Sequence, residues 1–353
     1  MQETLTARGC QKSIKELEIR LPIDYGVTRY SDTIADLSAL EGFVAACCES
    51  PDIPVTCTKR ETWERGTEPS QTRTLSFDPM IVCRDDFPTD PTPLFTTVMK
   101  QLARQADKVR FEFKEPISEF EEPISNPSPS YSQSAIDWAT QLSFDNAETV
   151  SFTSNLDHDF WMFTSYPPAP PIPRPSLTAF MQPFPKAKRL MLSGRVGGAA
   201  GRLLADKLPK QLNSVEIEGM EAAEAVGALQ ALGSGREVGT VTIGTAPRYR
   251  RPMRLGESAI AQLVGAAADL PTIGEFEFNP TFPPGREAEV RETVLGYLSS
   301  LLQLRGLRQL QMKRSVHIHD LPASVTVGGV AFTITQWPYR PNFGHTLTAK
   351  RET

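Results

Sequence analysis

The sequence has no apolar run long enough to cross a bilayer, a crossing that takes about 18 consecutive apolar residues. Its first residues, MQETLTARGCQKS, lack the apolar core of a secretory signal. Cysteine is scarce: the five cysteines are an odd number and all lie in the first quarter of the chain, which makes a poor disulfide framework. These absences predict a protein of a reducing compartment, the cytoplasm or the nucleus, that is not bound to a membrane.

Basic charge is not in excess, because the formal net charge is −5 at pH 7. Nucleic acid is therefore not indicated as a partner. Catalytic motifs are lacking as well: Asp157-His158-Asp159 has no serine or cysteine in a nucleophile-elbow context beside it. We therefore expect no enzyme, no catalytic residue and no cofactor.

What the sequence does contain is a short dyad, apolar-x-apolar, that returns along most of the chain. Each dyad alternates apolar with other residues over a few positions, which is the period of a β-strand. Apart from one longer step at the start, the dyads follow one another at spacings of roughly 20 to 50 residues, the range of solenoid repeats. The nine dyads begin at Leu17, Leu75, Val109, Val150, Leu190, Val215, Val241, Phe276 and Leu310.

Segments with helical spacing of apolar residues lie between the dyads. The clearest are residues 219–233, 257–270 and 286–304. A strand followed by a helix, repeated without a long crossover, predicts an α/β fold with parallel strands. Because one such unit cannot bury its own apolar stripe, neighbouring units are expected to stack into a solenoid.

The C-terminal region departs from this repeat. The segment SVTVGGVAFTIT places Gly328-Gly329 between two alternating apolar runs, which predicts a β-hairpin. A solenoid needs its last repeat covered, so we expect residues 321–337 to form a C-terminal cap. The predicted organisation is therefore one domain over residues 1–337, with about nine repeats, followed by a loose tail at residues 338–353.

The segments KAKRLMLSG, LNSVEIEG and LRGLRQLQMKR resemble leucine-rich repeats of the ribonuclease-inhibitor type, and more closely the irregular repeats of fungal F-box-type proteins. The resemblance covers about Ser13 to Asp320. It implies a right-handed horseshoe with a concave sheet and a protein-binding role. In the family an Asn or Cys after the strand dyad bonds the backbone of the turn, and here Asn279 is the one Asn at such a position.

The F-box of that family is an N-terminal helical segment that docks on a ubiquitin-ligase adaptor. We find no such segment here, because the first repeat strand is already expected at Leu17. A role as the substrate-recognition domain of an F-box-like ubiquitin-ligase receptor would therefore require an F-box upstream of Met1.

The main functional hypothesis is a monomeric, non-catalytic scaffold that binds a protein partner of unknown identity. In a strand–helix solenoid the strands line the concave face, where the outward residues alternate with the buried dyads. The predicted partner-binding residues are Glu112, Glu216 and Glu277 on that face, with Trp161 and Arg250 on loops at one rim. Because the outward positions lean acidic, the partner is expected to offer positive charge.

The two rim residues each belong to a cluster with two interpretations. Trp161 lies among aromatic residues that either anchor a partner or pack their loop onto the fold. Arg250 lies in APRYRRPMR, which is either a site for an anion or acidic peptide, or a solvated loop.

The enzyme alternative is a Rossmann-like nucleotide-binding protein that uses the turn from Gly194 to Gly201. Glycines at such a turn let backbone N–H groups approach a pyrophosphate at a helix N-terminus. The spacing is not a clean G-x-G-x-x-G, and a tight strand-to-helix turn accounts for the same glycines. No metal site is predicted at His317 and His319, because metal sites need three or four ligands.

Overall fold

The computed structural model divides into two compact units, Met1–Ser151 with Asp157–Ala187, and Phe152–Leu156 with Lys188–Thr353. The sequence analysis expected one domain over residues 1–337. The structure describes residues 4, 7–9, 19–21, 24–27, 43–48, 55–57, 60–62, 70–72, 74–77, 93–113, 140–154, 182–193, 206–218, 222–244, 255–280, 287–314, 318–340 and 344–352.

The first unit contains a parallel sheet with the strand order β2, β6, β7. Its strands are β2 (Asp24–Val27), β6 (Thr74–Phe77) and β7 (Lys108–Phe113), and helix α3 (Pro93–Gln105) leads into β7. In the core of this unit Phe111, Phe144 and Phe184 lie with ring centroids 5.4–6.2 Å apart. Strand β8 (Thr149–Ser154) has residues in both units.

The dyad that begins at Leu17 does not join this sheet. Its strand β1 (Ile19–Leu21) pairs with β3 (Val55–Cys57) in a separate two-stranded sheet. Strands β4 (Arg60–Thr62) and β5 (Ser70–Thr72) form a further antiparallel pair. These short strands were not predicted, because they lie in a polar segment without a dyad.

The second unit is built on five parallel strands whose order in the sheet is their order in the sequence. They are β9 (Arg189–Ser193), β10 (Gln211–Glu218), β11 (Glu237–Ile243), β12 (Thr272–Phe278) and β13 (Gln309–Arg314). Each contains one of the predicted dyads. The predicted α/β class with parallel strands is therefore confirmed.

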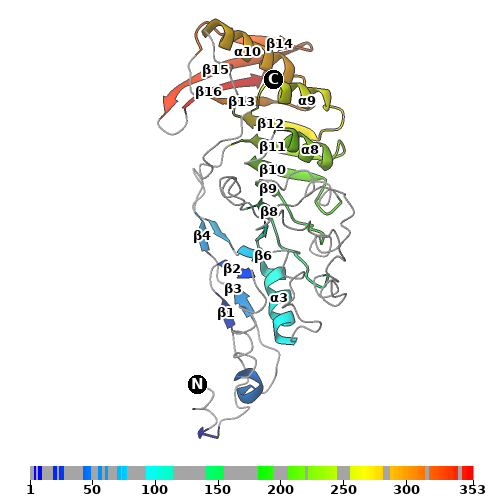
Figure 1. Ribbon diagram of the computed structural model, residues 1–353, viewed down its shortest axis with the longest axis vertical. Helices are drawn as coiled ribbons and strands as arrows, with labels where there is room; N and C mark the ends of the chain where they lie inside the picture. The colour runs from blue at the N-terminus through cyan, green and yellow to red at the C-terminus, as the bar shows by residue number, and fades with distance from the viewer. Residues whose placement is uncertain are drawn as a thin grey trace, which may run out of the picture. The chain divides into compact units, whose positions relative to one another are not determined.

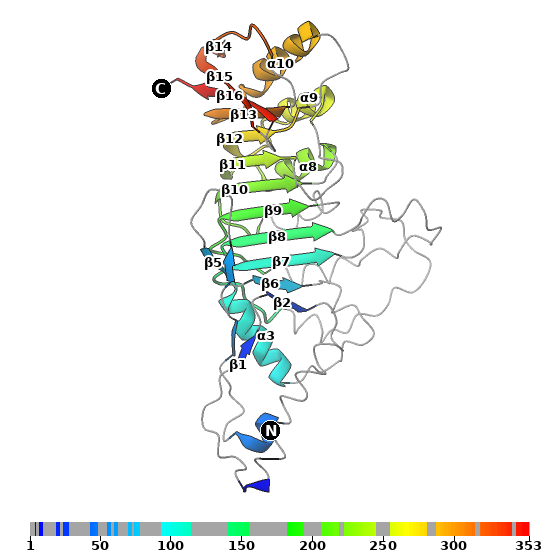
Figure 2. The same ribbon diagram turned by 90° about the vertical axis from the view of Figure 1, so that its left-hand side faces the viewer.

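Three helices of the second unit lie on the same face of this sheet, as both views show (Figures 1 and 2). They are α8 (Ala222–Leu232), α9 (Glu257–Gly265) and α10 (Glu287–Leu301). Each follows one strand and precedes the next, as the helical spacing predicted. Their buried residues, such as Leu229, Leu263 and Leu298, cover the apolar side of the strands.

The buried side of each strand follows a pattern longer than the dyad. A further apolar residue, three positions before the dyad, is buried with it. In β10 these residues are Leu212, Val215 and Ile217. The same spacing recurs at Val238, Val241 and Ile243, at Ile273, Phe276 and Phe278, and at Leu307, Leu310 and Met312. The residues Leu212, Val238 and Ile273 lie within β10, β11 and β12, and Leu307 lies two residues before β13, so the repeated unit has a third buried position besides the dyad.

Residues of β10 and β12 donate backbone hydrogen bonds to the residue directly before the neighbouring strand, β9 or β11. Asn213 N–H donates to the Lys188 carbonyl at 2.7 Å, and Thr272 N–H to the Arg236 carbonyl at 2.9 Å. The Arg236 guanidinium is buried here and donates to the carbonyls of Leu208, Pro209 and Leu232 at 3.1–3.3 Å. Burial lowers the pKa of Arg236, and the charge of Asp206 opposes that shift.

The sheet of the second unit ends in three antiparallel strands, β14 (Ser324–Val327), β15 (Val330–Arg340) and β16 (Gly344–Arg351). Strands β14 and β15 form the predicted hairpin, and Gly328 and Gly329 at its turn have φ of 58° and 78°. Positive φ at both central residues is the geometry of a type I′ turn, which glycine adopts without steric cost.

The predicted loose tail at residues 338–353 is wrong for most of its length. Strand β16 lies between β15 and β13 and pairs antiparallel with both. Leu347 and Ala349 are fully buried on the helix-covered side. These two apolar residues alternate with polar ones in GHTLTAKR, which is compatible with a strand, and pairing with both neighbours makes the segment one.

Candidate functional site

The polar side of the sheet in the second unit faces away from α8, α9 and α10, and we name it the strand face. It alternates with the buried positions of every strand, as a pleated sheet requires. Its residues are half-buried or exposed. It consists of Arg189, Met191, Ser193, Ser214, Glu216, Glu218, Thr240, Thr242, Glu275, Glu277, Gln309, Gln311, Lys313, Thr333, Thr335, Trp337, Thr346, Thr348 and Lys350.

The strand register places some of these residues in one row across the sheet. In the middle row each residue is the Cα partner of the next one. Neighbouring strands lie about 4.8 Å apart, so the two glutamates of this row, two strands apart, are about 10 Å from each other. The row is Met191, Glu216, Thr242, Glu277, Gln311 and Thr348.

Two of the five predicted partner-binding residues therefore lie in one row. Glu216 and Glu277 both point to the strand face. Glu112 lies on β7 in the first unit, and its side chain is outside the described residues. Trp161 and Arg250 are also outside the described residues. The structure thus brings together the predicted glutamates of β10 and β12.

Both glutamates already have a cationic neighbour. The Glu216 carboxylate accepts a hydrogen bond from Arg189 Nη2 at 2.9 Å, and Glu277 forms an ion pair with Lys313. The four side chains are 23–35% exposed. Partly exposed ion pairs contribute only about 0–1 kcal/mol each to stability. The pairs do, however, reduce the negative charge that these two strands offer to a partner.

Asn279 follows β12 and forms hydrogen bonds with the backbone of the neighbouring connection. Its side-chain amide donates to the Gly244 carbonyl at 3.0 Å, and Gly244 directly follows β11. Its own carbonyl accepts from the Leu255 N–H at 2.9 Å. This is the kind of contact that the resemblance to leucine-rich repeats predicted for Asn279.

Sequence reasoning missed Trp337. It lies on β15 at the strand face and is 57% exposed, the only large apolar side chain so exposed among the described residues. The signal was present in the sequence, because Phe332 and Ile334 are inward-facing and Trp337 has the opposite parity. The predicted hairpin was taken to end at this residue, so its side of the strand was not considered.

The residues of the nucleotide-binding alternative are mostly not placed. Residues 194–205 are outside the described residues. Glu216, an acidic residue on the strand that follows this turn, accepts a hydrogen bond from Arg189. His317 is also outside the described residues, and His319 is exposed. Within the described part of the chain no three His, Cys, Asp or Glu side chains are grouped to hold a metal ion.

The described cysteines of the first unit are free thiols. Cys47 and Cys48 are both buried, in and directly after a short helix at residues 43–47. Burial raises the pKa of the Cys48 thiol, and the neighbouring Cys47 adds to this shift. A raised pKa keeps the thiol protonated and unreactive, because the thiolate is the nucleophile.

The chain matches no protein-family model and no curated protein. Among the helices that the structure describes, none is both long and apolar enough to cross a membrane. Any functional proposal therefore depends on the geometry of the chain itself.

Proposed function

We propose that this protein is a non-catalytic scaffold that binds a protein partner on the strand face. The observation that carries the proposal is the row through Glu216 and Glu277, because it presents polar side chains at regular spacing on the side of the sheet opposite the helices. The helices α8, α9 and α10 cover the opposite side of the same strands (Figure 2). A surface of this kind suits a protein partner that contacts several different side chains at once.

The fold proposed with this function is a right-handed, leucine-rich-repeat-like solenoid with β14–β16 as its cap. The in-sequence order of β9–β13 and the bond from Asn279 to Gly244 support it. A doubly wound nucleotide-binding sheet would reverse its strand order once and carry helices on both faces. The strand order in the second unit therefore favours the scaffold over the nucleotide-binding alternative.

The proposed partner offers positive charge to the glutamates of β10 and β12. These strands carry Glu216, Glu218, Glu275 and Glu277 on the strand face. Complementary charge accelerates association and sets its salt dependence. A monomer in the cytoplasm or nucleus, acting alone or as the recognition part of an F-box-like ubiquitin-ligase receptor, is consistent with this proposal.

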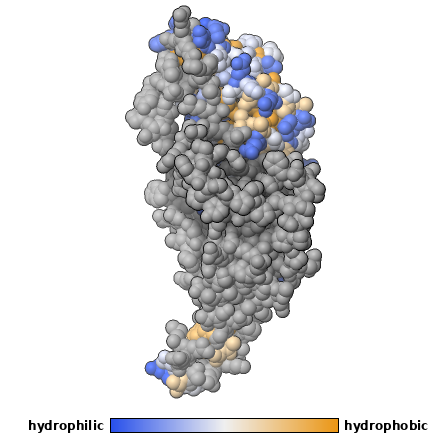
Figure 3. All heavy atoms as spheres, in the orientation of Figure 1, coloured by the Kyte–Doolittle hydropathy of each residue, from blue (hydrophilic) through white to orange (hydrophobic). Residues whose placement is uncertain are grey.

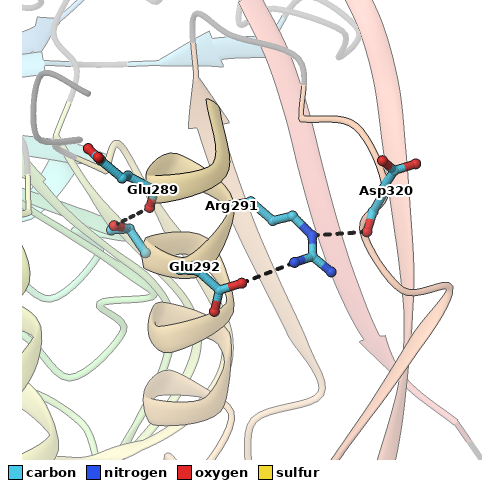
Figure 4. A network of polar contacts seen from close by, with 5 residues as sticks. Glu289, Arg291, Glu292 and Asp320 are labelled. Carbon is cyan, nitrogen blue, oxygen red and sulfur yellow. Dashed lines mark hydrogen bonds and ion pairs between the residues drawn. The ribbon is translucent and has the colours of Figure 1, made fainter. Parts of the chain in front are cut away.

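The test compares the double variant Glu216→Gln, Glu277→Gln with a matched control, Glu289→Gln. Glu289 is exposed on α10, away from the strand face. Figure 4 shows that its carboxylate takes no part in the network of Arg291, Glu292 and Asp320. The control therefore removes a negative charge of the same kind without disturbing the contacts of Arg291.

Partners captured from the source cell by the wild type would be identified by mass spectrometry, and their association rates measured against salt. We expect the double variant to associate several-fold more slowly and with a weaker salt dependence, because Arg189 and Lys313 are left unneutralised. The control should behave as the wild type. If the control abolished capture and the double variant did not, the strand face would not be the binding surface.

A further inference from the structure

The sheet of the second unit ends at β14, and among the described strands none lies beside its outer edge. In the sheet order β14 stands last and pairs with β15 alone, whereas β13, β15 and β16 each pair on both sides. Figure 2 shows β14 at the end of the sheet, beyond β15. The outer edge of an end strand presents backbone N–H and C=O groups that another strand can bond.

The register of the hairpin identifies the backbone groups at this edge. Because the turn has two residues, the two residues that flank it form a hydrogen-bonded pair, and such pairs alternate with non-hydrogen-bonded ones along the ladder. The bond from the Ile334 N–H to the Ala323 carbonyl, at 2.7 Å, follows the same alternation. Ser324 and Thr326 therefore turn both their N–H and their C=O groups away from β15. Among the described residues none bonds these four groups.

The edge of β14 lacks most of the features that prevent strands from pairing. Edge strands are commonly protected by charged side chains, by proline, by a bulge or by being short. Within its bounds β14 has the sequence SVTV, without charge or proline, and it pairs with β15 without a shift of register. Its length of four residues is the one protection that applies, and it limits the edge to a short segment.

The side chains of β14 indicate what such a segment is like. Val325 pairs with Phe332, so Val325 and Val327 lie on the helix-covered side of the sheet. Both valines are only half-buried, whereas Phe332 on the next strand is 2% exposed. Ser324 and Thr326 are exposed on the strand face. A strand added here would cover the valines with apolar side chains on one side and present polar ones on the other.

We propose that the edge of β14 binds an extended segment of the protein partner, which adds one strand to the sheet. Apolar residues of the segment alternate with polar ones and pack beside Val325 and Val327. Its backbone bonds the N–H and C=O groups of Ser324 and Thr326, as in other cases of strand addition. This inference rests on the proposed scaffold function. The added strand prolongs the strand face, so the segment lies next to the surface that the partner contacts.

A segment of the partner fits this edge better than a second copy of the chain. Two copies of β14 paired about a two-fold axis keep their helix sides together only if residues of equal parity meet. In the register centred on Thr326 only residues 324–328 of each copy face each other. Stable interfaces use about 20–30 residues a side. A segment tethered to an already bound partner needs less contact, because its binding is intramolecular.

The experiment uses the full chain and a fluorescent peptide of alternating threonine and valine, with lysine at each end for solubility. Two derivatives are N-methylated, one on every threonine amide and the other on every valine amide. In an extended peptide the two sets of amides point to opposite edges, so each derivative loses the donors of one edge. Binding is measured by fluorescence anisotropy, and the amide signals of Ser324 and Thr326 in NMR spectra locate the contact.

We expect the unmodified peptide to bind saturably and to shift the amide signals of Ser324 and Thr326. One methylated peptide should bind like the unmodified one and the other should not bind, because only one edge of the peptide bonds β14. Any other result with the methylated pair overturns the inference. Absence of saturable binding, or shifts confined to residues outside the hairpin, overturns it as well.

Two variants of one residue test the same edge from the side of the protein. Thr326→Pro removes an N–H that faces away from β15, and proline is tolerated at such edge positions. It should weaken the unmodified peptide about tenfold or more, since a hydrogen bond and close approach are lost. Thr326→Ala keeps the N–H and should bind like the wild type. Equal binding by wild type and Thr326→Pro would overturn the inference. If Thr326→Pro lowers the melting temperature strongly, the methylated peptides with the wild type decide.

These outcomes are separate from those of the proposed function. The double variant Glu216→Gln, Glu277→Gln should bind the peptide like the wild type, because these glutamates lie on β10 and β12. If a captured partner depends on the glutamates but the peptide does not bind, only the added strand is lost. If the peptide binds at β14 but no captured partner responds to the glutamate variant, the acidic contact of the proposed function is lost.

Sedimentation of the chain alone tests the second copy as the occupant. We expect the wild type and Thr326→Pro to sediment alike, as monomers, at the concentrations of the peptide experiment. A concentration-dependent dimer of the wild type that Thr326→Pro abolishes would overturn the inference in favour of pairing between two copies of β14.

Discussion

The parallel strands β9–β13 and the antiparallel strands β14–β16 belong to one sheet of the second unit but are built by different rules. In the parallel part the strands β10–β13 each have a third buried residue three positions before the dyad, and α8, α9 and α10 cover the buried side of the sheet. In the antiparallel part Phe332, Ile334, Leu347 and Ala349 are buried with a period of two. The first arrangement extends by adding units, and the second ends the sheet with a hairpin and a returning strand.

The two parts also differ on the strand face. The parallel strands from β10 to β12 present glutamates, whereas the antiparallel strands present threonines, Lys350 and Trp337. The element that closes the sheet therefore presents a surface of different composition from that of the parallel strands. A partner that spans both parts would meet two kinds of chemistry within one sheet.

Matched core truncations test whether the two parts unfold together. Phe276 and Phe332 are both almost fully buried, one in each part. Each Phe→Ala change should cost about 3–5 kcal/mol, because it removes the aromatic side chain and leaves a cavity. Thermal and denaturant unfolding should show both variants lowering the same transition. A Phe332→Ala variant that created a separate early transition would show the antiparallel part to be an independent appendage.

The buried guanidinium of Arg236 tests the turns of the parallel part. A helix ends with carbonyls that lack an intrahelical partner, and Arg236 satisfies one such carbonyl at Leu232 and two in the preceding turn. Arg236→Met should cost about 2–3 kcal/mol, because it leaves three buried carbonyls without this donor. Arg236→Lys would recover part of that stability if the charge matters more than the fork geometry. Denaturant titration gives both values.

Removing one side-chain amide donor from each part should have a smaller effect on stability. Asn279 donates to the Gly244 carbonyl and Gln336 to the Ile318 carbonyl, each at 3.0 Å and partly buried. Each change to Ala should cost about 1 kcal/mol. Hydrogen exchange should report the loss locally: after β11 for Asn279→Ala, and before β14 for Gln336→Ala. If hydrogen exchange rose instead in the part of the sheet that carries no substitution, the local unfolding of the two parts would be coupled.

Glycines should respond with opposite signs in the two parts. Gly227 in α8 and Gly296 in α10 lie within helices, and an added Cβ would meet nothing within 4 Å. Ala at either position should therefore raise stability by about 0.5–1 kcal/mol. At Gly328 a residue with a Cβ is strained by the positive φ, so Gly328→Ala should lower stability by about 1 kcal/mol. Small shifts in melting temperature would distinguish these signs.

The glycine variants of the helices also test whether the exposed side of the helices binds the partner. Figure 3 shows apolar residues between hydrophilic ones over α8 and α9. Exposed positions there include Ala223 and Ala261. If Gly227→Ala raised stability but abolished partner capture, the helix side would be the binding surface, in place of the strand face.

Period and turn chemistry made much of the second unit predictable. The dyads from Leu190 to Leu310 each gave a strand, because alternation over three residues survives in a half-buried sheet. The Gly328-Gly329 turn fixed the hairpin. The residue three positions before each dyad was overlooked because its parity is opposite to that of the dyad, so it falls outside the period of two.

Other features could not be predicted, because they depend on distant partners. Strand β16 becomes a strand by pairing between β13 and β15, and GHTLTAKR alone does not reveal those neighbours. The ion pairs of Glu216 with Arg189 and of Glu277 with Lys313 depend on strand register. The excess of acidic residues at the outward positions was visible in the sequence. The ion pairs that partly neutralise these residues and the exposure of Trp337 became visible only once the pairing of the strands was known.

The central claim, that the strand face binds the partner, is tested most directly by hydroxyl-radical labelling of the chain with and without its captured partner. Met191 and Trp337 report on the two ends of the strand face, and Leu295 of α10 reports on the helix side. We expect labelling of Met191 and Trp337 to fall on binding and that of Leu295 to be unchanged. Protection of Leu295 with undiminished labelling of Met191 and Trp337 would contradict it.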